Sequence, residues 1–90
     1  MLFKELNFND KQTVLKVWRW KIIKKVLEAI DFDVSRSSLN RYVEYLLEDT
    51  HYNPSDDVFY DPISRFKFTV DIFTSITVEY IYEHPSEFEK

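Results

Sequence analysis

Residues 66–82 have the sequence FKFTVDIFTSITVEYIY, and the conformation of this stretch decides the fold. Every even position carries an aromatic or β-branched side chain, whereas the odd positions between them are polar except Phe73 and Ile81. Such period-two alternation is typical of strands with one buried face. We therefore predict two strands, at about 65–72 and 76–83, joined by a short loop of odd length that leaves both strands facing the same way.

The same stretch also fits a single helix that begins at Asp61-Pro62 and ends before His84-Pro85. Aspartate is a favoured N-cap, and proline is well suited to the first helical position. A helix would remove the need for a hairpin turn without Gly, Asn or Asp. It would, however, leave Phe68, Ile72 and Val78 away from its apolar face, and the segment is poor in strong helix formers. The strand interpretation is preferred.

Two amphipathic helices are predicted before this stretch. The first spans about 9–30, begins at Asn9 or Asp10 as N-cap, and repeats apolar residues on one face at steps of three and four. The second spans about 36–49 and begins after Ser35 as N-cap.

The predicted fold class follows from these elements. It is α+β, with two N-terminal helices packed on one face of a small antiparallel β-meander, and an all-α three-helix bundle is the alternative. With 90 residues, 44% of them hydrophobic and 31% charged, the composition is that of one small globular domain. We predict a single domain over 1–90, in which 85–90 form an acidic tail.

The chain contains neither glycine nor cysteine. Phosphate-binding loops and nucleophile elbows need glycine because only a residue without Cβ reaches positive φ at low cost. Without cysteine there is no thiolate nucleophile and no Cys-type zinc site. The two histidines are far apart in the sequence and have no metal-ligand spacing. We therefore predict a protein that is not an enzyme and that uses no cofactor, metal or small-molecule substrate.

The net charge of −4 conceals a strong polarity along the chain. Residues 1–25 carry a net charge of +5, and residues 26–90 carry −9. A basic segment of one copy can therefore meet an acidic segment of another. No apolar run is long enough to cross a membrane and no signal peptide is recognisable, so we expect a cytoplasmic protein, of the producing or the host cell, without membrane contact.

Small polar and basic side chains mark the start of the second predicted helix. Residues 34–42 have the sequence VSRSSLNRY and follow VLEAI at 26–30. Residues 26–46 resemble the turn and recognition helix of helix-turn-helix and winged-helix DNA-binding domains. In that family, side chains at the start of the second helix reach base edges. The resemblance implies a DNA-binding transcriptional regulator as the alternative function. Its contact residues would be Arg36, Ser37, Asn40 and Arg41.

The leading functional prediction is a non-catalytic protein-binding module. We expect a small inhibitor or modulator of a host protein, of the kind that phages and mobile elements encode, acting through an acidic and aromatic surface on a protein partner or as a homodimer. Such a surface could also imitate the negative charge of DNA towards a nucleic-acid enzyme. The predicted binding residues are Trp20, Glu44, Tyr45, Glu48, Asp49, Tyr52, Asp56, Asp57 and Tyr60.

Overall fold

The computed structural model describes the chain over residues 8–89, with side chains from Gln12 on. Within this range it contains three α-helices, one 3-10 helix and a three-stranded antiparallel sheet, which confirms the predicted α+β class. In chain order the elements are α1 (Phe8–Ala29), α2 (Arg36–Glu48), β1 (His51–Asn53), β2 (Val58–Tyr60), β3 (Lys67–Phe68), α3 (Val70–Glu83) and the 3-10 helix η2 (Pro85–Glu87).

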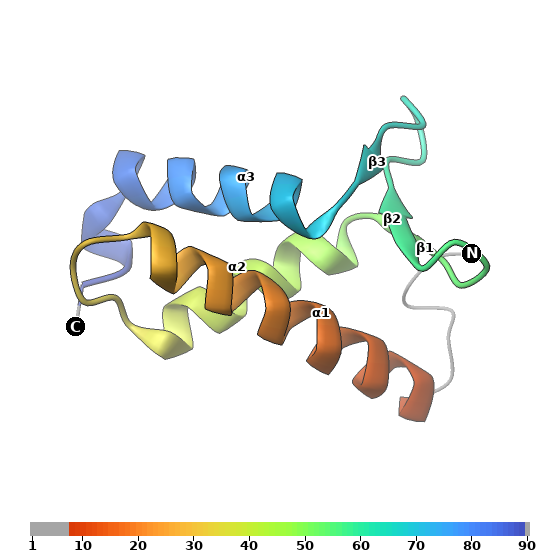
Figure 1. The fold of residues 1–90 in the computed structure, drawn as a ribbon, viewed down its shortest axis with the longest axis horizontal. Coiled ribbons are helices and arrows are strands. Elements are labelled where there is room, and N and C mark those ends of the chain that lie inside the picture. Colours follow the sequence, from red (N-terminus) through yellow and green to blue (C-terminus); the bar gives the residue numbers. More distant parts are fainter. Residues whose placement is uncertain (1–7, 90) are drawn as a thin grey trace.

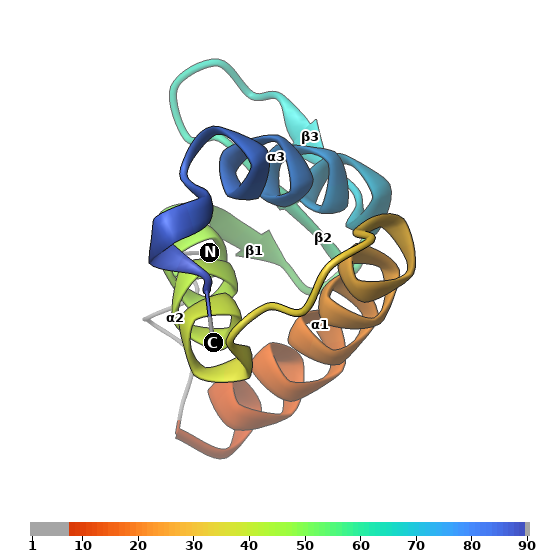
Figure 2. The same cartoon turned by 90° about the vertical axis from the view of Figure 1, so that its left-hand side faces the viewer.

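The three α-helices surround a common interior, and the sheet closes one end of it. Figure 2, viewed roughly along the helices, shows α1, α2 and α3 at the corners of a triangle. Figure 1 shows the sheet where α2 ends and α3 begins. At a rise of about 1.5 Å per residue, the 22 residues of α1 extend about 33 Å. The longest dimension of the molecule is 36 Å, so α1 runs along nearly its whole length.

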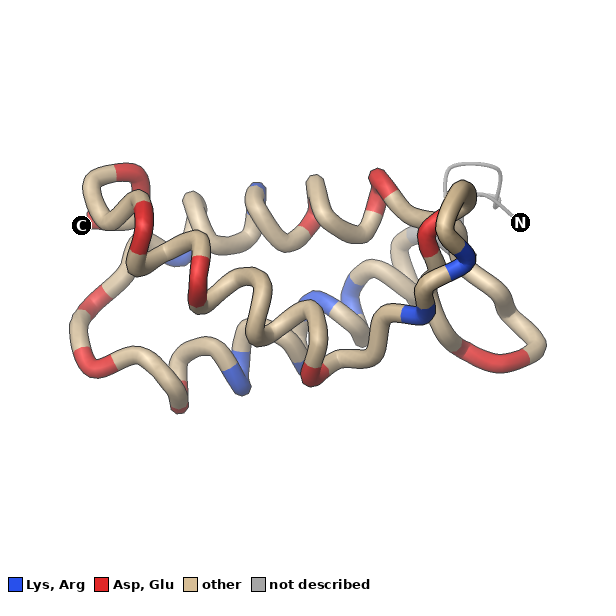
Figure 3. The backbone as a smooth tube through the Cα atoms, turned by 90° about the horizontal axis from the view of Figure 1, so that it is seen from above, with Lys and Arg blue, Asp and Glu red and all other residues tan. Residues whose placement is uncertain are grey.

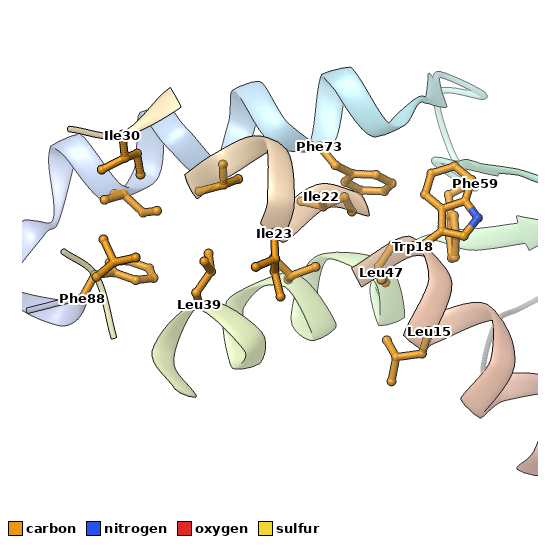
Figure 4. Close-up of a cluster of buried hydrophobic side chains, with 14 of the residues drawn as sticks. Leu15, Trp18, Ile22, Ile23, Ile30, Leu39, Leu47, Phe59, Phe73 and Phe88 are labelled. Carbon is orange, nitrogen blue, oxygen red and sulfur yellow. The ribbon is translucent and has the colours of Figure 1, made fainter. Parts of the chain in front are cut away.

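The core is built from one apolar face of each helix, as amphipathic helices require. The buried positions of α2 and α3 recur every four residues, at Leu39, Val43 and Leu47 and at Phe73, Thr77 and Ile81. The α1 face contributes Leu15, Trp18, Ile22, Ile23 and Val26. Figure 4 shows several of these side chains, with Trp18 beside Phe59 from the sheet. The ring centroids of Trp18 and Phe59 are 4.8 Å apart in an edge-to-face arrangement.

The sheet is a meander in the order β1-β2-β3. Phe59 is paired with Tyr52 on one side and with Phe68 on the other. Phe59 and Tyr52 are buried, and Phe68 is half-buried against the core. Because neighbouring residues of a strand point to opposite faces, the row that contains Tyr60 and Lys67 faces outward.

The prediction of strands at 65–72 and 76–83 is wrong over most of its range, because Val70–Glu83 is a helix and only Lys67–Phe68 is extended. Thr77 explains the error. Its hydroxyl donates a hydrogen bond to the Phe73 carbonyl, 2.8 Å away, so a residue assigned to a polar face is fully buried. The helix begins after Thr69, whose hydroxyl accepts from the Ile72 amide, and not at Asp61-Pro62 as in the single-helix alternative.

The segment predicted as an acidic tail packs against the body of the protein. Phe88 is only 2% exposed, and its ring contacts those of Tyr42 and Tyr80. The Phe88 carbonyl accepts a hydrogen bond of 2.7 Å from the Ser35 amide. The last residues therefore hold η2 beside the start of α2.

The predicted helix starts are partly confirmed. The Ser35 hydroxyl caps α2 by accepting a hydrogen bond from the Ser38 amide. The first helix begins at Phe8, so Asn9 and Asp10 lie within its first turn and not at the cap. Of the basic N-terminal segment, Lys4 lies outside the described residues.

Candidate protein-binding surfaces

The structure divides the predicted acidic and aromatic surface into residues that face solvent and residues used internally. The Glu44 carboxylate forms an ion pair with Arg19 of α1. Its charge is therefore largely neutralised, and the pair connects α1 to α2. The sequence predicts Glu44 as an acidic contact for a partner. Because its carboxylate is already paired with Arg19, the structure does not support this prediction.

Tyr52 and Asp57 take part in hydrogen bonds within the protein. One carboxylate oxygen of Asp57 accepts hydrogen bonds from the Tyr52 hydroxyl at 2.7 Å and from the Trp18 indole at 3.2 Å. Tyr52 is only 7% exposed, and its burial, followed by the hydrogen bond to Asp57, raises its pKa to about 12. Asp57 has a φ of 51°, which aspartate tolerates better than most residues. Tyr52 is thus too deeply buried to be an aromatic anchor, which corrects the prediction.

Three of the predicted residues form an exposed surface at the end of α2. We call Tyr45, Glu48 and Asp49 the α2 surface. The Tyr45 side chain is 63% exposed, and both acids are exposed as well. Tyr45 and its two acids are three and four residues apart, which places them on one side of the helix. Among the described residues, neither acid takes part in an ion pair.

Asp56 and Tyr60 belong to the β1–β2 hairpin that follows α2. Asp56 is exposed in the β1–β2 turn, where its carboxylate accepts a hydrogen bond from the Asn53 side chain. Tyr60 is half-buried on the outer row of the sheet, with its ring edge-on to His51 at 5.4 Å. Asn53, Tyr60, Arg65 and Lys67 line a shallow hollow of about 360 Å³ there.

Trp20 is exposed, as its position in the sequence predicts. It lies on the outer side of α1 with 62% of its surface exposed, and the Lys24 ammonium sits 5.2 Å from the ring centroid. A hollow of about 320 Å³ lies beside it, lined by Trp20, Lys21, Lys24, Lys25, Glu28 and Val70. None of these residues belongs to the α2 surface, so Trp20 and Tyr45, two of the four predicted aromatic binding residues, lie on separate surfaces.

The residues of the DNA-binding alternative lie at the start of α2. Arg36, Ser37 and Arg41 are exposed, whereas Asn40 is half-buried. The Arg41 guanidinium is 3.5 Å from the Ser38 hydroxyl. A hollow of about 220 Å³ is lined by Arg41 together with Glu87 of η2. A carboxylate therefore shares the surroundings of the basic group that would contact phosphate.

A second acidic region, which the sequence analysis missed, forms where α1 and α3 end. Figure 3 shows acidic residues gathered at the end of the molecule opposite the sheet. The Phe32 and Tyr82 rings pack edge to face at 5.8 Å, and the Tyr82 hydroxyl lies 3.4 Å from the Asp31 carboxylate. Tyr42 nearby has a pKa raised to about 12, first by burial and then by surrounding phenol and carboxylate groups that include Glu83. Residues 28–33 and 79–89 meet only through the fold, so sequence alone gave no signal for this region.

The β2–β3 loop presents apolar side chains to solvent. Ile63 is 92% exposed, and Phe66 is about half exposed. The Asp61 carboxylate accepts hydrogen bonds from the Ile63 amide at 2.7 Å and the Ser64 amide at 3.1 Å, and these bonds lower its pKa. The sequence carries one sign of this exposed loop, because the apolar Ile63 directly follows Asp61-Pro62, a pair typical of turns.

The described residues present several exposed surfaces and shallow hollows. Over residues 8–89 no group of three or more His, Asp or Glu side chains is placed to hold a metal ion. Within the same range no helix combines the length and apolar character that crossing a membrane requires. Comparison of the chain with protein-family models, curated proteins and solved structures found no match.

Proposed function

We propose that the protein is a non-catalytic binding module that inhibits or modulates another protein through the α2 surface. The observation that carries this proposal is the 63% exposed ring of Tyr45, one helical turn from two carboxylates that have no ion-pair partner among the described residues. Tyrosine is enriched among the residues that dominate binding energy, because it buries a large ring and still satisfies its hydroxyl. Carboxylates beside it steer a basic partner into place.

The body of the protein holds this surface rigidly. The opposite face of α2 buries Leu39, Val43 and Leu47 completely, and Ser35 caps the start of the helix. The Arg19–Glu44 pair connects the same helix to α1. A surface held in its binding conformation loses little conformational entropy when it meets a partner. The fold therefore fixes the backbone positions of Tyr45, Glu48 and Asp49 before binding.

The chemistry of the surface indicates the kind of partner. A tyrosine ring flanked by negative charge complements an apolar pocket rimmed by lysine or arginine. Basic clefts of this kind occur in proteins that bind nucleic acid, where the module would occupy the place of the phosphates. We propose that it acts in the cytoplasm, on a folded host protein with such a surface.

Affinity capture from cells of the native source tests this function. The wild-type chain is compared with Tyr45→Ala and Glu48→Lys, and the matched controls are Phe66→Ala and Asp33→Lys, which change an exposed ring and an exposed acid outside the α2 surface. We expect one stoichiometric protein that survives nuclease treatment and is lost with the two α2 variants but not with the controls. Equal retention by all five chains would refute the role of the α2 surface.

Repeating the capture after nuclease treatment distinguishes this function from DNA binding. The exposed Arg36, Ser37 and Arg41 at the start of α2 are the basis of that second candidate. If nuclease removes every partner, and if Arg41→Ala weakens binding to duplex DNA with a steep dependence on salt, the DNA-binding alternative replaces the proposed function. Glu87, in the same hollow as Arg41, opposes close approach of phosphate.

A further inference from the structure

The outer side of the sheet contains a shallow hollow of about 360 Å³ beside the β2–β3 loop. Its lining consists of Asn53 of β1, Tyr60 of β2, Arg65 of the loop and Lys67 of β3. Tyr60 and Lys67 are paired in the register of β2 and β3, so their side chains lie side by side on this face. Figure 1 shows the loop projecting from the end of the molecule where the sheet lies. Sequence analysis predicts no small-molecule site here because the four residues come together only through the sheet.

The hollow is basic although the chain as a whole has a net charge of −4. Arg65 and Lys67 are exposed, and neither takes part in an ion pair among the described residues. The described residues that line the hollow include no acid. Two acids of the neighbouring turns are hydrogen bonded within those turns, Asp56 to the Asn53 side chain and Asp61 to backbone amides. The two unpaired cations therefore favour an anion in this hollow.

Arg65 has a backbone conformation that is uncommon for its residue type. Its φ of 65° lies in the left-handed region, where glycine or asparagine is usual. The Arg65 amide donates a hydrogen bond of 2.9 Å to the Asp61 carbonyl, and the Asp61 amide donates one of 2.8 Å to the Phe66 carbonyl. These bonds fix the point from which the Arg65 side chain leaves the loop. Compared with glycine, arginine at this position places a guanidinium group at the hollow, and strained residues of this kind cluster at functional sites.

We propose that the hollow binds a phosphate monoester, with the phosphate group held by Arg65 and Lys67. A guanidinium group donates two parallel hydrogen bonds to phosphate oxygens, and an ammonium group adds a compact positive charge. Their two charges match the charge of about −2 that a phosphate monoester carries near neutral pH. The Tyr60 hydroxyl, which makes no hydrogen bond among the described residues, is a further donor. So is the Asn53 amide, because its hydrogen bond to Asp56 uses only one of its two N–H groups.

The size of the hollow indicates that the phosphate is carried by a larger group. Its volume of about 360 Å³ is close to the lower limit of about 300 Å³ for ligand pockets, and a bare phosphate ion would leave much of it empty. The remaining space lies beside the Tyr60 ring, which offers an apolar surface to a ring of the ligand. A nucleotide and a phosphorylated tyrosine side chain share this chemistry.

NMR titration of the isotope-labelled chain in phosphate-free buffer tests the site. The phosphorylated probes are AMP and phenyl phosphate, and the matched probes without phosphate are adenosine and phenol. We expect saturable shifts of the amide signals of Asn53, Tyr60, Arg65 and Lys67 with a phosphorylated probe and none with its counterpart. Tighter binding of AMP would indicate a nucleotide as the ligand, and tighter binding of phenyl phosphate would indicate a phosphorylated tyrosine side chain.

Variants assign the binding to the two cations. Arg65→Gln and Lys67→Gln each remove one charge and should weaken binding at least about tenfold, because hydrogen bonds to charged groups are the stronger ones. Arg36→Gln and Lys21→Gln make the same changes at exposed positions outside the hollow and should alter the affinity by less than about twofold. Circular dichroism of each variant checks that it remains folded.

Three results would overturn the proposal. The first is the absence of saturable shifts with both AMP and phenyl phosphate at about 10 mM, a concentration that detects even millimolar dissociation constants. The second is equal binding of adenosine or phenol. The third is equal weakening by the control variants, which would indicate only a general attraction to positive charge.

The proposed phosphate site is independent of the proposed function. None of its four residues belongs to the α2 surface. Arg65→Gln and Lys67→Gln should therefore leave the capture of a partner protein unchanged, and Tyr45→Ala should leave the binding of AMP and phenyl phosphate unchanged. Failure of one proposal is thus distinguishable from failure of the other.

Discussion

Replacing Phe88 by alanine should cost a large share of the stability of this small domain. The ring is 2% exposed and lies 6.1 Å from the Tyr42 ring centroid and 5.8 Å from that of Tyr80. The backbone of the same residue accepts a hydrogen bond from Ser35, so the last turn of the chain covers one end of the core. Removing the ring would leave a cavity between η2, α2 and α3.

The magnitude follows from the burial of the ring. Truncating a core phenylalanine to alanine costs about 3–5 kcal/mol. We expect a loss of at least about 3 kcal/mol, the lower value of this range. Small domains unfold with only about 5–15 kcal/mol. Between about a fifth and three fifths of the free energy of unfolding would therefore be lost, although the residue belongs to a segment that resembles an acidic tail.

Urea denaturation followed by tryptophan fluorescence measures this loss, because Trp18 is buried in the core. With a slope of about 1.5 kcal/mol per molar urea, the midpoint should fall by about 2 M. Phe88→Leu, which keeps most of the volume, should lose less than about 1.5 kcal/mol. Glu89→Ala, at an exposed neighbour, is the control and should have little effect. If Phe88→Ala and Glu89→Ala were equally stable within about 0.5 kcal/mol, the docking of this segment would be refuted.

Three further predictions concern single interactions. The pKa values of Tyr42 and Tyr52 are raised from 10.0 to about 12, so the unfolded state loses these protons first. The contribution of these two tyrosines to the free energy of unfolding should be constant with pH below about 10 and fall between about 10 and 12, and Tyr52→Phe should make this fall shallower in urea titrations. Asp57→Ala leaves the Trp18 indole and the Tyr52 hydroxyl without their acceptor and should cost about 1–3 kcal/mol in thermal denaturation. Asp57→Asn, which keeps an acceptor and tolerates positive φ, should cost less; an equal loss would contradict the role of the hydrogen bonds. Thr69→Ala removes the cap of α3 and should cost about 1 kcal/mol, with faster amide exchange in the first turn of α3. Thr69→Ser, which retains the hydroxyl, should restore protection.

The two N-terminal helices were predictable because local rules govern them. The apolar repeat of residues 9–30 and the cap at Ser35 specify a helix face and a helix start without reference to the rest of the chain. The prediction of strands in residues 65–83 was wrong because alternation of polar and apolar residues distinguishes strand from helix only when polar side chains are exposed. Thr77 satisfies its hydroxyl within its own helix and is buried.

The candidate surface was predictable only in part. The exposure of Trp20 followed from its angular position on the first helix, and the exposure of Tyr45 followed from its position opposite the apolar stripe of the second. The internal roles of Glu44, Tyr52 and Asp57 did not follow. The partners of the two acids, Arg19 and Trp18, lie on α1, 25 and 39 residues away in sequence. Only the tertiary structure decides whether a carboxylate in a polar stretch is free or already hydrogen bonded.

The sequence by itself determined the two leading helices, the absence of glycine-dependent sites and the separation of charge along the chain. These properties depend on composition and on local periodicity. The tertiary structure decided that Val70–Glu83 is a helix, that Phe88 closes the core and that the acidic segments 28–33 and 79–89 meet at one end of the molecule. It also decided which charges remain free for a partner, because pairing within the protein depends on contacts between residues far apart in the sequence.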